Sequence, residues 1–414
     1  MNGGKNIDTL ILGGGAAGVA AAVAAAQKGA NIVLIERNAY LGGKATAAEV
    51  GTICGLYKFT RSAVSEYIVK GFAREFADAL QQASNTKPLH GNEGLHYLPY
   101  DVEAFKKICI DLLHKNNVEV MLNCTLTNVN VADEKIVSAF VTNEERSMKL
   151  DIRSIVDCSG DSIISRAAHL PLITSDHYQA AAQVFTMEHV EEENESRLGL
   201  IIMKALRSAI DKGELEDHYD RVYIVQGSLK NKKVSLKIGI PVPVTHEHGN
   251  LRQLKRSAAE LVETLTGFLI SHVAAFKHAG IEHIAAEPGI RVGPRPVGNY
   301  MLTEEDVLTC KKFDDAIANA PWPIEEWEQQ KRVKMRYFRL DDHYQVPAGC
   351  LQSKAIKNLF MAGRNISASD AAIASARVMG ICLQTGYAAG DMAASCALGI
   401  PLFDSIRSIQ NRQL

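Results

Sequence analysis

Three glycines near the start of the chain have the spacing that binds the phosphates of a dinucleotide. Gly13, Gly15 and Gly18 fill the pattern G-x-G-x-x-G directly after the apolar run 9–12. The first glycine permits a tight turn, the second lets backbone approach a pyrophosphate, and the third lets a helix pack closely on a strand. Glu36 follows a second apolar run about 20 residues farther on, where a carboxylate can bind a ribose hydroxyl. This order predicts a dinucleotide site rather than an ordinary βαβ unit without a nucleotide.

Two arginines in the second half of the chain, Arg291 and Arg295, have a spacing that suits an anionic substrate. Side chains four residues apart on an extended strand point to the same face. Two guanidinium groups on one face would bind a carboxylate. The alternative, that either arginine pairs with an acid such as Glu287 or Asp306, is equally open. Arg295 is therefore a candidate for contact with an anionic substrate.

His343 and Tyr344 are two further candidates for catalysis. Histidine changes its charge near neutral pH, so His343 has the side-chain type best suited to a general base. Tyr344 could orient a substrate through its hydroxyl group. Both assignments rest on residue type and on position in the sequence.

A second glycine pair follows the dinucleotide motif, in the order Glu36, Arg37, Gly42, Gly43. This continuation resembles that of FAD-dependent oxidoreductases of the two-dinucleotide-binding-domain type, which have a glutathione-reductase-like fold. The stretches LGGKAT, SGD, GNYMLTEEDV, YQVPAGCL and NLFMAGRNISAS extend the resemblance over most of the chain. The resemblance implies FAD rather than NAD as the cofactor, and it does not indicate the substrate.

The resemblance also implies which residues bind FAD. The backbone of Leu126 would face the adenine, and Gly363 would lie near the ribityl chain. Many relatives have Gly-Asp where this chain has Gly363 and Arg364, so Arg364 is expected to contact phosphate. A helix beginning at 377–379 would point its positive end at the flavin C2 carbonyl. The predicted cofactor-binding residues are Gly13, Gly15, Ala16, Ala17, Gly18, Glu36, Arg37, Gly42, Gly43, Lys44, Thr46, Leu126, Ser159, Gly160, Asp161, Gly363, Arg364, Arg377, Val378 and Met379.

Cys54 lies in the segment that, in this family, runs from the phosphates towards the flavin ring. A thiolate there could exchange electrons with the ring, which makes Cys54 a catalytic candidate. The disulfide reductases of this type carry two cysteines in this loop, whereas this chain has one. A packed and inert cysteine is therefore the favoured alternative.

The elements that must position these residues indicate an α/β fold. Apolar runs at 9–12 and 31–35 predict buried parallel strands, and the alanine-rich stretch 16–28 predicts the helix between them. Residues 136–150 predict an antiparallel hairpin that crosses over the sheet. Apolar residues at helical spacing predict a helix over 62–82, and a charged stretch predicts another over 321–337.

The chain is too long for one compact core, so we expect two domains. Residues 1–169 and 341–414 are predicted to form a discontinuous Rossmann-like FAD-binding domain. Residues 170–340 are predicted to form an inserted α+β substrate domain, because strand and helix patterns alternate there without the glycine motifs.

Composition excludes several classes of function. The net charge of −2 gives no support to binding of nucleic acid or of anionic membranes. The eight cysteines contain no C-x-x-C pair, and His246 and His248 have no third ligand nearby, so no metal site is expected. No apolar run is long enough to span a membrane, and no signal peptide is evident, so we expect a cytoplasmic protein that could be a homodimer.

These observations favour an enzyme in which FAD takes a hydride from a small organic substrate, at an amine, an amino acid, a hydroxy acid or a C–C bond. No second glycine motif with its own strand and acid is present, so re-oxidation by oxygen or an external acceptor is expected. The alternatives are a flavin reductase or monooxygenase that uses NAD(P)H, and a non-catalytic flavin-binding carrier subunit. Methyl transfer with flavin would require a reactive Cys54 and is less favoured.

Overall fold

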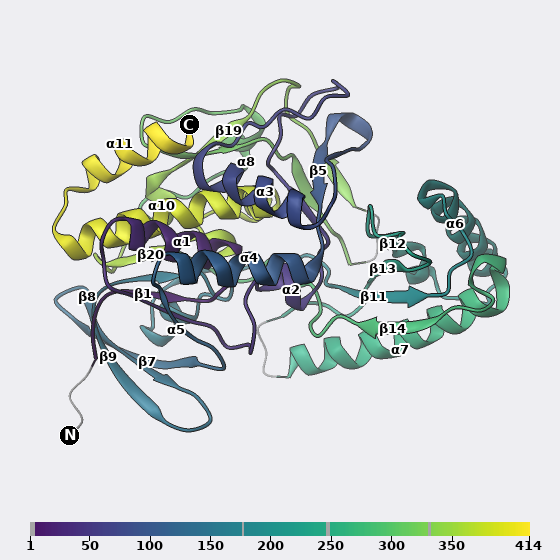
Figure 1. Ribbon diagram of the computed structural model, residues 1–414, viewed down its shortest axis with the longest axis horizontal. Helices are drawn as coiled ribbons and strands as arrows, with labels where there is room; N and C mark the ends of the chain where they lie inside the picture. The colour runs from purple at the N-terminus through teal and green to yellow at the C-terminus, as the bar shows by residue number, and fades with distance from the viewer. Residues whose placement is uncertain (1–4, 176–177, 246–248, 330–332) are drawn as a thin grey trace.

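The structure is a computed structural model that describes residues 5–175, 178–245, 249–329 and 333–414. His246 and His248 lie outside these ranges. Figure 1 shows a large unit built around a mixed sheet and a smaller unit at one side, in which two long helices pack against a second sheet.

The central sheet confirms the predicted α/β fold. Its strands are β1 (Lys5–Leu12), β2 (Ile32–Ile35), β6 (Glu119–Met121), β7 (Thr125–Ala132), β8 (Lys135–Thr142), β9 (Ser147–Asp157) and β20 (Leu359–Met361). They lie in the order β6-β2-β1-β9-β8-β7, and β20 pairs with β9. The pairs β6–β2, β2–β1, β1–β9 and β9–β20 are parallel, whereas β7, β8 and β9 are antiparallel. The first half of β9 therefore belongs to the crossover hairpin, and its second half lies in the parallel core.

Small residues bring two helices into close contact above this sheet. The helices of the large unit are α1 (Ala16–Gln27), α3 (Gly71–Ala83), α4 (Val102–Lys115), α10 (Met379–Leu398) and α11 (Leu402–Gln413). A Cβ atom on Gly386 of α10 would lie 2.2 Å from the Ala17 carbonyl oxygen, and one on Gly390 would lie 2.0 Å from that of Ala21. Glycines at these positions therefore let α10 lie against α1 with their backbones in contact (Figure 1).

The second sheet is antiparallel and forms most of the smaller unit in Figure 1. It has the order β12-β13-β11-β14, with helices α6 and α7 beside it; the bounds are β11 (Ala182–Glu188), β12 (Val222–Ile224), β13 (Val234–Gly239), β14 (Gly280–Ile284), α6 (Glu195–Asp211) and α7 (Asn250–His272). Asn194 caps α6, since its side chain accepts a hydrogen bond from the Arg197 backbone N–H at 2.9 Å. The division of the sequence at 169/170 and 340/341 remains a proposal.

Shorter elements complete the fold. They are α2 (Lys44–Ala47), β3 (Thr52–Cys54), β4 (Leu89–His90), β5 (His96–Pro99), α5 (Ile163–Ala167), β10 (Leu172–Ile173), β15 (Arg295–Pro296), α8 (Glu304–Leu308), β16 (Ala316–Ala320), β17 (Ile324–Glu326), β18 (Lys334–Arg336), β19 (Tyr344–Pro347) and α9 (Asp370–Ala376). Strand β16 pairs with β19, and β17 pairs with β18. Thr303 caps α8 with the expected side-chain bond to the Asp306 N–H.

Two predicted helices differ from the structure. Residues 321–337 contain the strands β17 and β18 instead of a helix, because their backbones pair with each other from Ile324 to Arg336. The helix expected over 62–82 begins only at Gly71, whose φ of +52° places it in the left-handed region. Residues before Gly71 therefore cannot continue the same right-handed helix.

Candidate functional site

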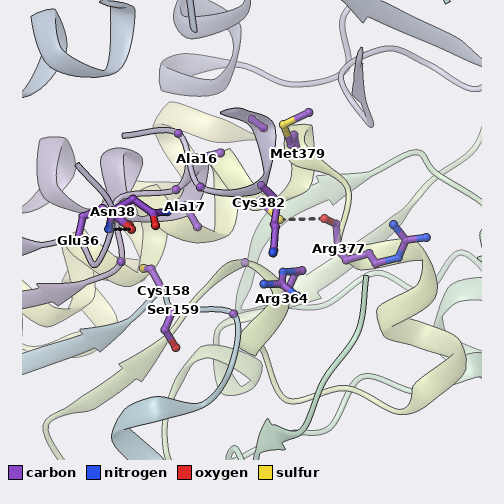
Figure 2. A pocket seen from close by; sticks show the side chains of 18 of the residues that line it. Ala16, Ala17, Glu36, Asn38, Cys158, Ser159, Arg364, Arg377, Met379 and Cys382 are labelled. Carbon is purple, nitrogen blue, oxygen red and sulfur yellow. Dashed lines mark hydrogen bonds between the residues drawn. The ribbon is translucent and has the colours of Figure 1, made fainter. Parts of the chain in front are cut away.

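A cavity lies at the carboxyl ends of the parallel strands, between α1, α10 and the turn after β9 (Figure 2). Its lining comes from segments that are far apart in the sequence: Gly13, Gly15, Ala16, Ala17, Glu36, Arg37, Asn38, Gly42, Gly43, Lys44, Ala45, Cys158, Ser159, Gly160, Glu287, Gly363, Arg364, Arg377, Met379 and Cys382. We call this space the first cavity. Its position agrees with the rule that ligands of open α/β sheets bind beyond the carboxyl ends of the strands.

The glycines of the first cavity are required by close backbone approach. A Cβ atom on Gly18 would lie 1.7 Å from the carbonyl oxygen of Gly13, so α1 can rest on the turn only with glycine at this position. A Cβ atom on Gly43 would lie 2.9 Å from the Cα atom of Gly15. The two glycine loops are therefore in contact, and together they expose backbone to the cavity.

The start of α1 offers an anion-binding surface to the first cavity. Gly15 is its N-cap residue and no side chain caps it, so the N–H groups of its first turn have no partner within the helix. The helix dipole adds partial positive charge at the same end. A pyrophosphate group has the charge and the acceptor atoms that this surface requires.

Glu36 forms the wall at one end of the first cavity, as Figure 2 shows. It is buried, and its carboxylate accepts hydrogen bonds from the N–H groups of Gly14 at 2.6 Å and Asn38 at 2.9 Å. These bonds fix the carboxylate at the end of β2. It is therefore positioned to accept further hydrogen bonds from the hydroxyl groups of a ribose.

Asp157 shapes the opposite wall. This buried carboxylate accepts bonds from the Ser159 hydroxyl at 2.5 Å, from the Ile164 N–H at 2.9 Å and from the Asn365 amide at 2.7 Å. Burial raises the pKa of Asp157, while the bonds from Ser159 and Ile164 oppose that change. The turn at Ser159 and Gly160 is therefore held against the cavity by a side chain that itself lies outside it.

Cations of the first cavity are paired with acids. Glu287, which follows the second sheet, lies 2.6 Å from the Lys44 ammonium and 3.1 Å from the Arg37 guanidinium. Arg37 also lies 3.6 Å from Asp161, and Arg364 lies 3.9 Å from the same residue. Burial lowers the pKa of Lys44, and the Glu287 charge opposes this effect. The positive charges are thus held at the cavity wall with carboxylates beside them.

A second cavity adjoins the first where α10 begins. The two share Lys44, Ala45, Arg364, Arg377 and Met379. Figure 2 shows the Arg377 and Met379 side chains at this end, opposite to Glu36. The second cavity is further lined by Ala48, Val50, Thr52, Cys54, Ala182, Val184, Lys237, Gly289, Ile290, Arg291, Glu325, Trp327 and Val378. Both units of the molecule therefore contribute to it.

Lys237 and Arg291 both lie over one aromatic ring in the second cavity. The guanidinium carbon of Arg291 is 3.9 Å from the centroid of the Trp327 ring, and the Lys237 nitrogen is 4.6 Å from it. Arg291 also donates a hydrogen bond to the Ala180 carbonyl oxygen. Burial, and then the neighbouring arginine charge, lower the pKa of Lys237 to about 8. Burial and the Arg377 charge lower the pKa of Arg291 in the same way.

Arg377 and Glu325 form the other charged part of the second cavity. The Glu325 carboxylate accepts bonds from the indole N–H groups of Trp322 at 3.3 Å and Trp327 at 3.1 Å. It lies 3.7 Å from the Arg377 guanidinium, which also donates to the Gln179 side chain at 3.3 Å. Glu325 is thus oriented by two indoles and pairs with the arginine that borders both cavities.

The structure brings most of the predicted cofactor-binding residues together. Of that set, Gly18, Thr46, Leu126, Asp161 and Val378 do not line the first cavity. Gly18 lies beneath the turn, and Thr46 donates to the Leu41 carbonyl oxygen at 2.8 Å. Leu126 pairs with Val141 in the hairpin, and Val378 lines the second cavity.

Three of the four predicted catalytic residues line neither cavity. Arg295 is fully buried and pairs with Asp370 at 2.5 Å, so the alternative of an internal ion pair describes it, although with a different acid. Tyr344 is fully buried, and its hydroxyl lies 2.6 Å from that of Ser375. His343 is partly buried, and burial and the Lys312 charge lower its pKa to about 4. The contacts of Arg295 and Tyr344 are internal to the fold, and none of the three residues lines a cavity.

Cys54 does line the second cavity, but its thiol is not ionised to the reactive thiolate. Burial and the nearby Glu325 carboxylate raise the pKa of Cys54 to about 12, so the thiol stays protonated near neutral pH. No disulfide is present among the eight cysteines. The packed-cysteine alternative fits this geometry better than a redox role.

Sequence reasoning missed residues that reach the cavities from distant segments. In the first cavity these are Asn38, Ala45, Cys158, Glu287 and Cys382. In the second they include Lys237, Glu325 and Trp327. Lys237 carried one signal, since it alternates with the apolar residues of β13, but a lysine on a strand is most often a solvent-exposed residue.

Comparison with protein families identifies the kind of protein that contains these cavities. The model of the family described as FAD dependent oxidoreductase matches residues 8–403. The chain belongs to this family. FAD is its cofactor, and the first cavity has the uncapped helix, the glycine loops, the acid at the end of β2 and the cations that the cofactor needs. The resemblance noted in the sequence is confirmed.

Solved structures agree on the fold at low sequence identity. A geranylgeranyl bacteriochlorophyll reductase-like protein from Thermoplasma acidophilum is 13% identical with a TM-score of 0.52, over 99% of this chain and 83% of that one. The aromatic hydroxylase CabE from angucycline biosynthesis is 11% identical with a TM-score of 0.50, over 98% and 68%. The anhydrotetracycline hydroxylase OxyS from Streptomyces rimosus is 12% identical with a TM-score of 0.50, over 97% and 65%. No curated protein matches the sequence.

The described ranges hold neither a metal-binding cluster nor a membrane-spanning helix. Within them, no group of three or more His, Cys, Asp and Glu side chains could hold a metal ion. No helix in the same part of the chain is both long and apolar enough to cross a membrane.

Proposed function

We propose that this protein oxidises a small organic molecule in the second cavity by transfer of a hydride to FAD, which is re-oxidised by oxygen or an external acceptor. The observation that carries the proposal is the joining of the two cavities at Arg377 and Met379. A substrate in the second cavity would be in contact with the cofactor at the beginning of α10. Bound FAD supplies the two-electron chemistry there.

The residues around this junction suit a hydride acceptor. Arg377 borders both cavities, and the positive end of the 20-residue helix α10 points to the same place. Both favour negative charge at the junction. The cavity wall also contains small and apolar side chains, among them Val50, Val184 and Ile290. This wall would exclude water from the substrate.

The alternative of a carrier subunit has less support. A protein that only stores flavin needs no polar cavity beside it, whereas an enzyme must bind and orient a substrate. Lys237, Arg291, Glu325 and Arg377 place four ionisable side chains in the second cavity. Ionisable groups in such a cavity are costly to bury unless they serve a ligand or each other.

Anaerobic reduction tests the proposal. The purified protein, with its flavin absorbance recorded, would be mixed without oxygen with amines, amino acids, hydroxy acids and saturated acids, and then with NADPH. We expect the flavin absorbance to bleach with one of the organic classes and to recover when air is admitted. The Trp322→Phe variant removes one indole bond to Glu325 at the edge of the second cavity, and it should slow bleaching without loss of FAD.

Two outcomes would contradict the proposal. Bleaching by NADPH alone would indicate a reductase or a monooxygenase; two of the solved structures of similar fold are named as hydroxylases. A protein that binds FAD but is bleached by no organic class and by no NADPH would favour the carrier subunit.

A further inference from the structure

Two cations in the second cavity form no ion pair with a described acid, although the Glu325 charge acts on both from beyond ion-pair distance. Arg377 is paired with Glu325 at 3.7 Å. Among the described residues, Lys237 and Arg291 form no ion pair with a carboxylate, and Lys237 has no hydrogen-bond acceptor. Both side chains lie over the Trp327 ring. The cluster of three cations and one carboxylate therefore carries an excess of positive charge.

The first cavity offers a contrast, because two of its cations share one acid. There, Glu287 lies within 3.1 Å of both Arg37 and Lys44. Burying a charge without a partner costs much more free energy than burying a pair. An unpaired cation pair in a cavity therefore indicates that a ligand supplies the missing negative charge.

The strand register explains how Lys237 reaches this place. Lys237 on β13 lies directly opposite Val184 on β11, so the two side chains share one face of the second sheet. Ala182 and Val184 line the second cavity from the same face. The sheet of the smaller unit thus presents an apolar surface with one ammonium group to the junction with the cofactor.

We propose that Arg291 and Lys237 bind a carboxylate group, so that the substrate of the second cavity is a small organic acid. That this acid is the substrate rests on the proposed function. The binding of the acid does not depend on that function. A guanidinium group matches a planar carboxylate with two parallel N–H donors. The small apolar side chains of Ala48, Val50 and Ala182 suit a short carbon chain better than a fully hydrated inorganic ion.

Ligand titration of the FAD-loaded protein tests the site without turnover. The probes are propionate, its uncharged analogue propionamide, and inorganic phosphate. Binding would be followed by the change in the flavin absorbance and by calorimetry. We expect propionate to bind, and propionamide to bind at least about tenfold more weakly, because a hydrogen bond to a charged group is lost. Phosphate should bind more weakly than propionate.

Variants assign the effect to the two cations. Arg291→Met and Lys237→Met should each weaken propionate binding by about tenfold or more. Arg291→Lys and Lys237→Arg, which keep the charge, should weaken propionate binding less. The matched control is Lys233→Met, because Lys233 lies just before β13, pairs with Glu282 and lies outside both cavities. It should leave propionate binding unchanged.

Each contrary result overturns the inference. Equal binding of propionate and propionamide, unchanged binding in both methionine variants that retain FAD, or tighter binding of phosphate would exclude a carboxylate site. So would the absence of propionate binding by the wild-type protein. If propionate binds through Arg291 but no organic class bleaches the flavin, the carboxylate site stands and the proposed oxidation fails.

Discussion

The two cavities differ in how their charges are balanced. In the first, Glu287 and Asp161 accompany the cations that face the cofactor phosphates. In the second, Glu325 pairs with Arg377, while Lys237 and Arg291 lie over an indole ring and form no ion pair with a described carboxylate. The cavity with a resident cofactor is thus closely paired, whereas the adjoining cavity has an excess of positive charge. This difference separates a permanent ligand from one that enters and leaves.

The cavities also differ in where their residues come from. The core of the first is one βαβ unit, in which the glycine turn and the acid at the end of β2 lie within a short stretch of sequence. The second is assembled from β3, β11, β13, β17 and the start of α10. Its geometry therefore depends on how the two units pack, and we expect its substitutions to affect binding before they affect folding.

The largest expected effect on stability comes from a substitution beside the first cavity. Gly18→Ala would place a Cβ atom 1.7 Å from the Gly13 carbonyl oxygen, so α1 would have to move away from the turn. We expect a loss of at least about 3 kcal/mol of unfolding free energy, together with loss of bound FAD. Urea unfolding and the flavin absorbance of the purified protein would measure both.

A matched glycine provides the control for this change. Gly267 lies within α7 and has no neighbouring atom within 4 Å of a built Cβ. Gly267→Ala should therefore leave FAD binding intact and raise stability by up to about 1 kcal/mol, because alanine is the better helix former. Equal stability of the Gly18→Ala protein and the wild type would show that the turn is not closely packed.

The next largest effect distinguishes the structural role of Arg295 from the ligand-binding role proposed for Arg291. Arg295→Ala breaks a pair with Asp370 and two bonds to the carbonyl oxygens of Ala368 and Gly293. We expect a loss of about 2–3 kcal/mol of stability, less than for a fully buried pair because Asp370 is about half exposed. Thermal unfolding would measure it, with Arg256→Ala on the exposed face of α7 as the control.

Arg291→Ala should show the opposite pattern, with little loss of stability and a weaker affinity for organic acids. If Arg295→Ala instead weakened the binding of acids and left stability unchanged, Arg295 would be the substrate contact that its spacing first suggested. Arg291 would then no longer support the difference in charge balance between the two cavities.

Particular residues explain what the sequence could predict. Gly13, Gly15 and Glu36 were found because their function depends on contacts within one βαβ unit. Lys237 was missed because only the pairing of β13 with β11 brings it beside Val184 and the second cavity. Such pairings depend on tertiary packing, and single-sequence patterns do not contain them.

The prediction that Arg291 and Arg295 share one face of a strand was wrong for a related reason. Arg291 lies in an irregular segment, while Arg295 begins the short strand β15 and pairs with Ile173. The chain between them is not one extended strand, so the rule that alternate residues share a face does not apply. The two side chains consequently reach different environments.

The pH dependence of acid binding tests the unpaired cations directly. Lys237 faces Arg291, Glu325, Cys54 and Arg377, and burial lowers its pKa to about 8. A bound carboxylate would raise this pKa. Propionate affinity should thus be constant below pH 8 and fall by about tenfold per pH unit above it, because the free lysine must then take up a proton.

Calorimetry over this range would give the slope, and Lys237→Met supplies the control. Its weaker affinity should be nearly constant from pH 7 to about 8.5, since the titrating amine has been removed and the pKa of Arg291 is about 9. An identical slope in the methionine variant would assign the titration to another group and remove Lys237 from the site.

The smallest expected effect concerns Glu287, which balances the cations of the first cavity. Glu287→Gln keeps an acceptor for Lys44 but removes the carboxylate charge that lies beside both Lys44 and Arg37. The phosphates of FAD would then meet two cations without a competing negative charge. We expect FAD to bind about threefold more tightly at low salt, and this gain to shrink as salt is added. Quenching of flavin fluorescence would measure the dissociation constant.

Glu282→Gln is the matched control, because Glu282 lies on β14 and pairs with Lys233 outside the first cavity. It removes the same charge five positions earlier in the sequence and should leave FAD affinity unchanged. If Glu287→Gln weakened FAD binding, the carboxylate would be orienting Lys44 and Arg37 rather than opposing the phosphates. Pairing in the first cavity would then serve the cofactor directly, and the lack of pairing around Lys237 would distinguish the second cavity more sharply.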